Sequence, residues 1–270
     1  MRNAVFTLFV ALLCSQATSA QTTAPAPPPY YNVYAYMKVA PGMENDYLKL
    51  EKAWKKIHAA SKAAGTLESW SLSQVLAPAG ASAEYNYVAR NGLEGDVQLA
   101  NFFEGSFAPN WKSLLTKEEI ALVDRTDEIR TMVKMEVWSE IDKTMAPDMG
   151  KSKIVVVNYF SSPEGKTRAD HIKMEQEIWK PVHAARVKDG TMKGWLLYGL
   201  ELPFGESMPY NMMSVDVYTD MKQYLAPWFD EYFKKVHPGK NVDELMKQTS
   251  AVEILTKGEL RMVIDRLDWK

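Results

Sequence analysis

Two histidines, 125 residues apart (183 − 58 = 125), are the side chains of this sequence best suited to chemistry. His58 lies in Trp-Lys-Lys-Ile-His-Ala-Ala and His183 in Trp-Lys-Pro-Val-His-Ala-Ala, so that Trp54 and Trp179 precede them by four residues. Imidazole can transfer protons near neutral pH. A spacing of four places indole and imidazole on one face of a helix. We therefore predict that both histidines act as bases at a cleft between helix and sheet.

A structural role is the alternative for each histidine. A histidine near the end of an amphipathic helix can bond a loop carbonyl while the tryptophan fills the core. A carboxylate partner would favour catalysis, but Glu51 lies seven residues before His58. This spacing corresponds to about 10.5 Å along a helix, too far for a direct bond. The offset of 125 places Gln176 at the matching position. The sequence therefore predicts no Glu–His pair on this helix.

Further aromatic and amide residues repeat at the same offset. They could shape a ligand pocket beside the histidines, since indole and phenol rings offer apolar area with one polar atom. The alternative is structural, because Asn favours turns and tryptophan favours the core. The predicted ligand-binding residues are Trp54, Trp179, Trp70, Trp195, Tyr85, Tyr210, Asn86 and Asn211.

Metal ligands are not apparent in the sequence. The histidines are His58, His171, His183 and His237, and no two of them have the close spacing of a metal-binding pair. We therefore predict no metal site and no cofactor. Haem is the one alternative, because a single imidazole can hold its iron.

Hydrophobic patterns indicate the elements that position these residues. The constant offset indicates a duplicated unit, and each copy reads as strand, helix, two strands, helical segments and a final strand. The first copy has predicted strands at 31–39, 69–76, 85–91 and 132–141 and helices at 44–64, 96–103 and 117–125. The second has strands at 153–160, 194–200, 210–218 and 259–267 and helices at 167–188, 221–235 and 242–250.

A β-α-β-β-α-β order used twice is the ferredoxin-like plan. We predict an α+β protein with two tandem ferredoxin-like domains, residues 31–143 and 152–270. One such domain exposes an apolar sheet face. Two antiparallel sheets in one chain can cover each other by packing face to face as an intramolecular barrel. Closure within the chain leaves monomer and homodimer as alternatives.

The start of the chain has the features of an export signal. Arg2, an apolar run and small residues predict a signal peptide at 1–20, followed by a Pro-rich spacer at 21–30. Cleavage would remove Cys14, the only cysteine, so no disulfide is expected. The mature protein should be periplasmic or secreted. No other apolar run is long enough for a membrane span, and a formal net charge of −2 argues against nucleic-acid partners.

The duplicated unit resembles the dimeric α/β-barrel superfamily. The resemblance rests on the aromatic first strand, the Trp-Lys-x-x-His-Ala-Ala helix ending in Gly, the Trp strand and the Pro-x-Gly-x-Ser-x-x-Tyr-Asn hairpin. It is closest to exported bacterial members with tandem units and unassigned activity. The superfamily includes haem-degrading and cofactor-free monooxygenases, isomerases and dye-decolourising peroxidases. Haem-degrading members are expected to carry their histidine on the second helix and a strand asparagine. Here the histidines are on the first helix, and Asn158 is matched by Ala35.

These observations predict an exported protein that binds a small, largely apolar molecule in a helix–sheet cleft of one or both halves. One alternative is a monooxygenase or isomerase of the dimeric α/β-barrel type, cofactor-independent or haem-linked, with His58 and His183 as bases. The other is a non-catalytic structural or scaffold protein, in which the duplication only supplies a stable barrel.

Overall fold

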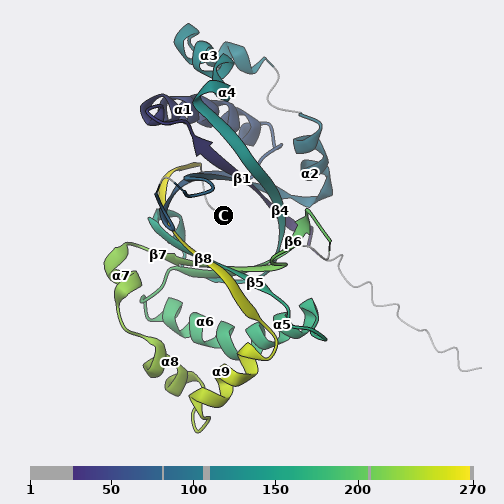
Figure 1. Ribbon diagram of the computed structural model, residues 1–270, viewed down its shortest axis with the longest axis vertical. Helices are drawn as coiled ribbons and strands as arrows, with labels where there is room; N and C mark the ends of the chain where they lie inside the picture. The colour runs from purple at the N-terminus through teal and green to yellow at the C-terminus, as the bar shows by residue number, and fades with distance from the viewer. Residues whose placement is uncertain (1–26, 81, 106–109, 206–207, 268–270) are drawn as a thin grey trace, which may run out of the picture.

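The strands of the protein close into one antiparallel barrel. The computed structural model describes residues 27–80, 82–105, 110–205 and 208–267. Over these residues eight strands follow the order β1-β3-β2-β8-β5-β7-β6-β4, and β4 pairs with β1 to complete the ring. Figure 1 looks along the barrel, with the helices of the first half on one side and those of the second half on the other. The predicted α+β barrel is confirmed, while the predicted signal peptide lies outside the described residues.

Each half of the chain contributes four strands. The first half supplies β1 (Tyr30–Val39), β2 (Ser69–Ala77), β3 (Tyr87–Glu94) and β4 (Arg130–Met145). The second supplies β5 (Ile154–Ser161), β6 (Gly194–Leu202), β7 (Met212–Tyr218) and β8 (Ile254–Leu267). The ring therefore contains the consecutive sets β4-β1-β3-β2 and β8-β5-β7-β6. The halves join by hydrogen-bonded pairs, β2 with β8 and β4 with β6.

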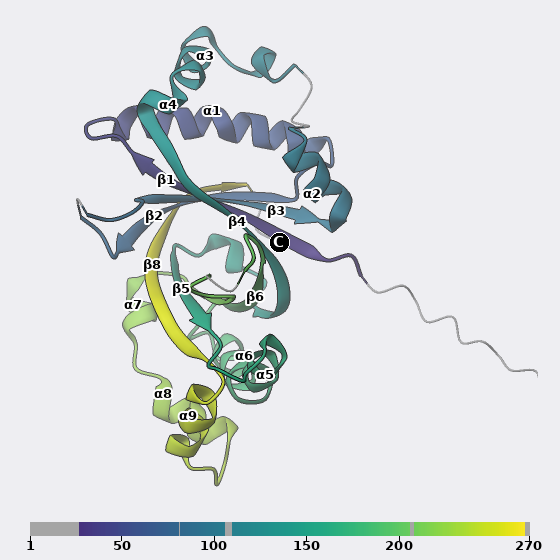
Figure 2. The same ribbon diagram turned by 45° about the vertical axis from the view of Figure 1, so that its right-hand side comes forward.

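Helical segments pack outside the barrel (Figure 2). Those of the first half are α1 (Glu44–Ala63), α2 (Gly95–Phe103), η1 (Trp111–Leu114), α3 (Lys117–Asp124) and α4 (Thr126–Ile129). The short η2 (Met149–Lys151) lies between the halves. Those of the second half are α5 (Arg168–Met174), η3 (Glu175–Trp179), α6 (Lys180–Lys188), α7 (Met221–Leu225), α8 (Phe229–Val236) and α9 (Val242–Ser250). The single helix predicted at 167–188 contains a π-helical turn, η3.

The last strand of each half is longer than its sequence pattern predicts. β4 begins before the predicted 132–141 and continues beyond it, and β8 begins five residues before the predicted 259–267 (259 − 254 = 5). Both strands pair with their own half on one side and with the other half on the other side. Hydrogen bonding to two neighbouring strands extends β4 and β8 through residues that show no clear alternation of apolar and polar side chains.

The barrel interior is a packed core, filled by side chains from both halves. Tyr36, Tyr85 and Trp138 come from the first half, and Tyr159 and Tyr210 from the second. The hydroxyls of Tyr36 and Tyr159 lie 3.0 Å apart across the two halves. Apolar layers also fill the space between barrel and helices, on the α1 side and on the α6 side. Clefts between helix and sheet are therefore separate from the barrel interior.

A buried ion pair lies within this core. Arg261 Nε donates to Glu259 Oε2 at 2.8 Å, and both residues are 2% exposed. Lys257 lies 2.7 Å from the other carboxylate oxygen, and Tyr85 also donates to it. The Tyr159 hydroxyl accepts from Arg261 at 2.6 Å. The charges of this pair thus balance within one strand, β8, and aromatic hydroxyls from other parts of the barrel bond to them.

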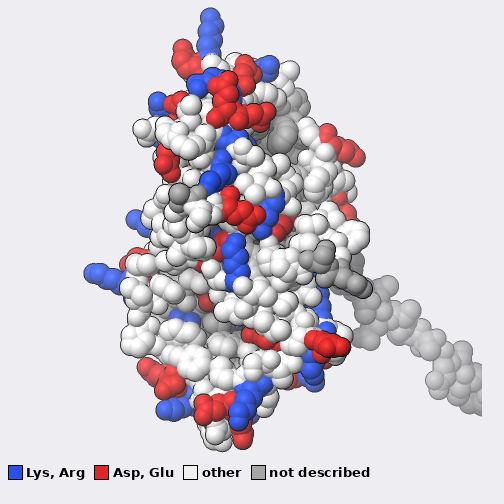
Figure 3. Space-filling view, in the orientation of Figure 1, with Lys and Arg blue, Asp and Glu red and all other residues white. Residues whose placement is uncertain are grey.

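The outer surface has mixed charge. On the face in Figure 3, acidic and basic side chains are interspersed, in keeping with 32 basic and 34 acidic residues in the chain. Among the described helices, none combines the length and apolar character of a membrane span.

Candidate functional site

The first predicted histidine lies in an aromatic stack between α1 and the sheet. His58 projects from α1 toward Trp70 of β2, with ring centroids 5.5 Å apart and planes inclined by 23°. The Trp54 ring, one helical turn earlier, lies 6.1 Å from the imidazole. These three rings border a cavity of about 140 Å³, which Glu51 also lines. The predicted grouping of these residues is therefore present.

The second histidine has the same surroundings. His183 of α6 stacks on Trp195 of β6 at 5.6 Å and on Trp179 at 5.8 Å, with planes inclined by 13° and 18°. The adjoining cavity measures about 360 Å³. We call this cavity the second-half cleft, and it is the larger of the two.

The side chains that line the second-half cleft are aromatic and polar, and they come from several strands and helices. The apolar lining is Phe160, Trp179, Trp195, Trp228, Phe229 and Leu255, and the polar lining is Asn158, Glu175, His183, Ser214, Asp216 and Glu253. Arg186 is fully buried, and its guanidinium lies 3.7 Å from the Trp228 ring centroid. This cation–π contact supports one wall. Apolar walls with a few convergent polar groups are typical of small-molecule sites.

Strand register explains why the second-half cleft is the more polar one. Asn158 of β5 pairs with Ser214 of β7, and Asn158 Nδ2 donates to Ser214 Oγ at 3.3 Å. The matching pair in the first half is Ala35 of β1 and Ala89 of β3. Both pairs line their clefts. Polar substitutions at two facing positions thus give one cleft hydrogen-bonding groups that the other lacks.

The π-helical turn η3 (Glu175–Trp179) brings a carboxyl into the second-half cleft. The constant offset predicts Gln176 opposite Glu51, but Gln176 instead donates to Asp142 Oδ2 at 2.9 Å. One extra residue in the helix shifts the register, so Glu175 takes the position of Glu51 (175 − 51 = 124). The expectation that the second copy lacks this acid is therefore wrong. A π turn is one residue longer than an α turn, and sequence spacing does not reveal it.

Burial keeps both imidazoles neutral. It lowers the pKa of His58 to about 4 and, with help from nearby Arg186, the pKa of His183 to about 3. Both groups are therefore weaker bases than an exposed histidine. Among the described residues, the Nδ1 atom of His183 has no hydrogen-bond partner. The loop-carbonyl bond of the structural alternative is therefore not observed at this nitrogen.

The carboxyl groups of the second-half cleft are also shifted. Burial raises the pKa of Asp216 to about 7, an effect that Arg186 opposes. Burial likewise raises the pKa of Glu175 and Glu253, and each has another carboxyl nearby that adds to the rise. Perturbed groups gathered beside a cavity are characteristic of functional sites.

The shifted pKa of His183 predicts a pH-dependent stability. The unfolded chain binds a proton near pH 6.5, whereas the folded chain does so only near pH 3. Stability from this group is therefore complete above pH 6.5 and is lost as the pH falls. The loss amounts to about 2 kcal/mol between pH 7 and pH 5. Urea unfolding at both pH values gives the change in the free energy of unfolding between them. This change should be larger for the wild type than for His183→Gln by the same amount. Identical pH dependence would contradict the assignment.

The predicted Tyr-Asn pairs do not lie in the clefts. Tyr85 and Tyr210 are 3% and 6% exposed and belong to the barrel interior. Asn86 Oδ1 accepts from Val39 N at 2.9 Å, and Asn211 lies at the same point before β7. The assignment of the two tyrosines to the cleft of the histidines is thus corrected to the barrel interior, and Asn86 bonds the backbone of β1 instead. Successive strand residues face opposite sides of a sheet, so these tyrosines lie on the face away from the helices.

A further cavity, of about 460 Å³, lies at the mouth of the barrel. Lys134, Glu136, Tyr210 and Lys257 contribute to its lining. The Tyr210 hydroxyl accepts from Lys134 at 2.6 Å and donates to Glu136 at 2.6 Å. The charges at this mouth are already balanced by neighbours.

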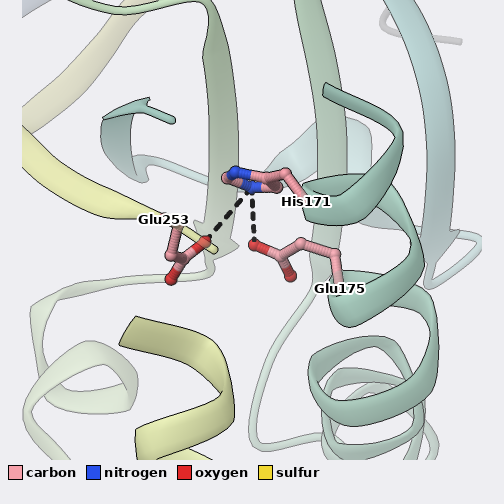
Figure 4. A group of neighbouring side chains, drawn as sticks. All are labelled: His171, Glu175 and Glu253. Carbon is pink, nitrogen blue, oxygen red and sulfur yellow. Dashed lines mark ion pairs between the residues drawn. The ribbon is translucent and has the colours of Figure 1, made fainter. Parts of the chain in front are cut away.

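One cluster escaped the sequence reasoning. His171 Nε2 lies 3.6 Å from Glu175 Oε1 and 3.1 Å from Glu253 Oε2 (Figure 4). The spacing of four between His171 and Glu175 was a usable signal, since it places them on one helix face. Glu253 is 78 residues further along (253 − 175 = 78), and only the fold brings it there.

The sequence matches no protein-family model and no curated protein. Solved structures do resemble the fold. A proposed monooxygenase from Lactobacillus acidophilus has a TM-score of 0.52 at 14% identity, covering 88% of this chain and 94% of that one. An anthrone oxidase-like protein has a TM-score of 0.50 at 10% identity, covering 89% and 93%. A haem-binding protein from Thermus thermophilus has a TM-score of 0.48 at 11% identity, covering 88% and 92%.

The first two likenesses show that the architecture of this chain also occurs in other solved proteins. At identities of 14% and 10% they show the fold alone, since one fold hosts many activities. The predicted barrel fold is therefore confirmed, while membership of the superfamily stays a prediction.

Proposed function

We propose that the protein binds a small, planar, largely apolar molecule in the second-half cleft. The observation that supports this proposal is a cavity of about 360 Å³ with aromatic walls and several buried polar groups. Its size lies toward the lower end of the usual range for small-molecule sites, about 300–1,000 Å³. A molecule of one or two rings suits this space better than a porphyrin, so haem is not part of the proposal.

The unpaired polar atoms suggest the chemistry of the ligand. Among the described residues, His183 Nδ1 and Asp216 Oδ1 have no hydrogen-bond partner. A hydroxyl group on an aromatic ring can donate to one and accept from the other, while the ring packs on the indoles of Trp179 and Trp195. Leaving such atoms unpaired is costly in a buried site. We therefore favour a phenol-like ligand.

We also propose that the two halves of the barrel are tandem copies of one unit. The identical strand order of the two sets, β4-β1-β3-β2 and β8-β5-β7-β6, supports two ferredoxin-like units at residues 31–143 and 152–270. The matching His–Trp stacks support it further. Export through the signal at 1–20 completes the proposal and would expose the site to ligands outside the cytoplasm.

A cofactor-independent monooxygenase is the second candidate. It is supported by the fold likeness to a proposed monooxygenase. In this role His58 and His183 would accept a proton from an acidic substrate. Their lowered pKa values of about 4 and 3 weaken them as bases, which is why binding takes precedence. Oxygen uptake in the presence of a bound phenol would distinguish catalysis from binding.

Calorimetry with 1-naphthol, a two-ring phenol, tests the binding proposal. The mature protein should bind it saturably with one equivalent. Ser214→Leu fills the second-half cleft and should weaken binding at least tenfold. Ala89→Leu, the matched change in the first half, should leave binding unchanged. Native mass spectrometry of protein from its own host would reveal the natural ligand.

Two results would contradict this proposal. One is the absence of saturable binding by one- and two-ring phenols together with no co-purifying molecule. The other is equal weakening by both leucine variants. Replacement of both His58 and His183 by Gln then distinguishes the scaffold alternative from a binding protein. A scaffold role predicts a lower melting temperature with no change in ligand binding.

A further inference from the structure

Three potential metal ligands meet at one end of the second-half cleft. His171 comes from α5, Glu175 from η3, and Glu253 directly precedes β8 (Figure 4). One donor atom from each lies within 4.8 Å of the others. Glu175 and Glu253 also line the cavity, while His171 lies behind them, fully buried. The cluster thus has a protein side and a side that faces the cleft.

The donor atoms of this cluster lack hydrogen bonds within the described part of the chain. Both ring nitrogens of His171, Glu175 Oε2 and Glu253 Oε2 are buried and unpartnered. His171 Nε2 is 3.1 Å from Glu253 Oε2, yet no hydrogen bond forms. A hydrogen bond needs the oxygen close to the N–H direction. A metal ion bound to the ring nitrogen would itself occupy that direction, and the carboxylate oxygen would then lie to one side of it. The arrangement suits a shared cation better than a direct bond.

The first half shows what occupies the matching place on its helix. Tyr47 and Glu51 stand four residues apart on α1, as His171 and Glu175 do on the α5–η3 segment, with equal offsets (171 − 47 = 124; 175 − 51 = 124). The phenol of Tyr47 stands in the place of His171, and burial together with the nearby Glu51 carboxyl raises its pKa well above the usual range, so it stays protonated and cannot serve as an ordinary metal ligand. The second half has an imidazole there instead, which can.

The strand beside the cluster reverses its charge between the halves. Arg130 begins β4 and lies 3.8 Å from Glu51. Strand register pairs Met37 with Met132 and Phe160 with Leu255, so that Glu253 matches Arg130 (255 − 132 = 123; 253 − 130 = 123). The first half therefore has a built-in cation beside its buried carboxylate. The second half has a second carboxylate in its place, and the compensating positive charge must come from elsewhere.

We propose that His171 Nε2 and the carboxylates of Glu175 and Glu253 bind a divalent first-row transition-metal ion, with an open coordination position toward the second-half cleft. Donors about 2.0–2.2 Å from one ion are separated by roughly 3.0–3.6 Å, and the observed 3.1 Å and 3.6 Å agree. One imidazole with two carboxylates favours zinc, manganese or iron over magnesium and calcium, which prefer oxygen ligands alone.

Metal titration of the mature protein tests this site directly. After removal of metals with EDTA, the protein is titrated with Co²⁺, followed by visible absorption, and with Zn²⁺ by competition calorimetry. One equivalent of each should bind, and Zn²⁺ should raise the melting temperature. Glu253→Gln should weaken Zn²⁺ binding at least tenfold and change the Co²⁺ spectrum. Glu51→Gln, the matched variant of the first half, should leave both unchanged.

The result that would overturn the site is wild-type protein without saturable Co²⁺ or Zn²⁺ binding. Undiminished affinity in Glu253→Gln would overturn it too, as would equal loss in Glu51→Gln. Circular dichroism verifies folding, and Glu175→Gln replaces any variant that does not fold. The titration uses the metal alone, so its failure leaves phenol binding untouched, and failure of 1-naphthol binding leaves the metal site untouched.

Discussion

Replacement of Glu259 by Ala is expected to destabilise the protein by about 3–5 kcal/mol, because it leaves a buried charge without its partner. Glu259 and Arg261 are both 2% exposed and bonded at 2.8 Å inside the barrel. Although burial alone would raise the pKa of Glu259, Arg261 and Lys257 hold it at about 2. The carboxylate is therefore charged at neutral pH. Urea unfolding at pH 7 measures the loss.

Two comparisons test the cause of this loss. The double variant Glu259→Leu with Arg261→Met removes both charges and should recover most of the stability, since paired apolar residues tolerate such a site. Glu136 corresponds to Glu259 by offset, but Trp138 stands where Arg261 would be (261 − 138 = 123). Glu136→Ala should therefore cost less than Glu259→Ala. A loss below about 1 kcal/mol for Glu259→Ala would contradict a buried ion pair.

Replacement of Trp195 by Ala is expected to cost about 3–5 kcal/mol, the usual range for a buried large aromatic residue. Trp195 is 1% exposed and stacks on His183. The change removes that stack and opens the second-half cleft into the space of the indole. Thermal and urea unfolding report the loss. Trp70→Ala is the matched change, since Trp70 is also 1% exposed and stacks on His58.

Added indole provides the control for the Trp195→Ala variant. Apolar cavities created by truncation can bind small apolar molecules, and indole has the shape of the deleted group. Indole should raise the melting temperature of Trp195→Ala by more than it raises that of the wild type, because only the variant has the space of the deleted side chain. A variant that loses less than about 1 kcal/mol would show that Trp195 is dispensable to the packing.

The regular elements were predictable because their patterns are local. The helix predicted at 44–64 is observed as α1 (Glu44–Ala63), where buried Tyr47, Leu50 and Ile57 recur at helical spacing. The lengths of β4 and β8 were not predictable. Those strands continue because a second neighbour from the other half supplies hydrogen bonds, and such distant pairing leaves no periodic trace in either segment.

The candidate site was predictable only where the repeat is undisturbed. His183, Trp179 and Trp195 follow the constant offset, and the structure stacks them together. Glu175 does not follow it, because η3 adds a residue to the helix. Glu253 was hidden for another reason. A carboxylate far along the chain becomes a neighbour only through the register of β8 with β5. The hydrophobic pattern alone does not fix that register at the point where the strand begins.

The pairings that close the ring also limit how molecules of this protein can associate. In the described part of the chain, each strand has a hydrogen-bonded neighbour on either side. Unpaired strand edges are the usual template for adding a foreign strand. The register leaves a free edge where the two long strands overhang the ring, as at residues 130–136 of β4 and residues 254–259 of β8. Addition of a foreign strand would therefore be confined to such overhangs, and other association would use the outer helices or the loops, where side chains rather than backbone groups determine specificity.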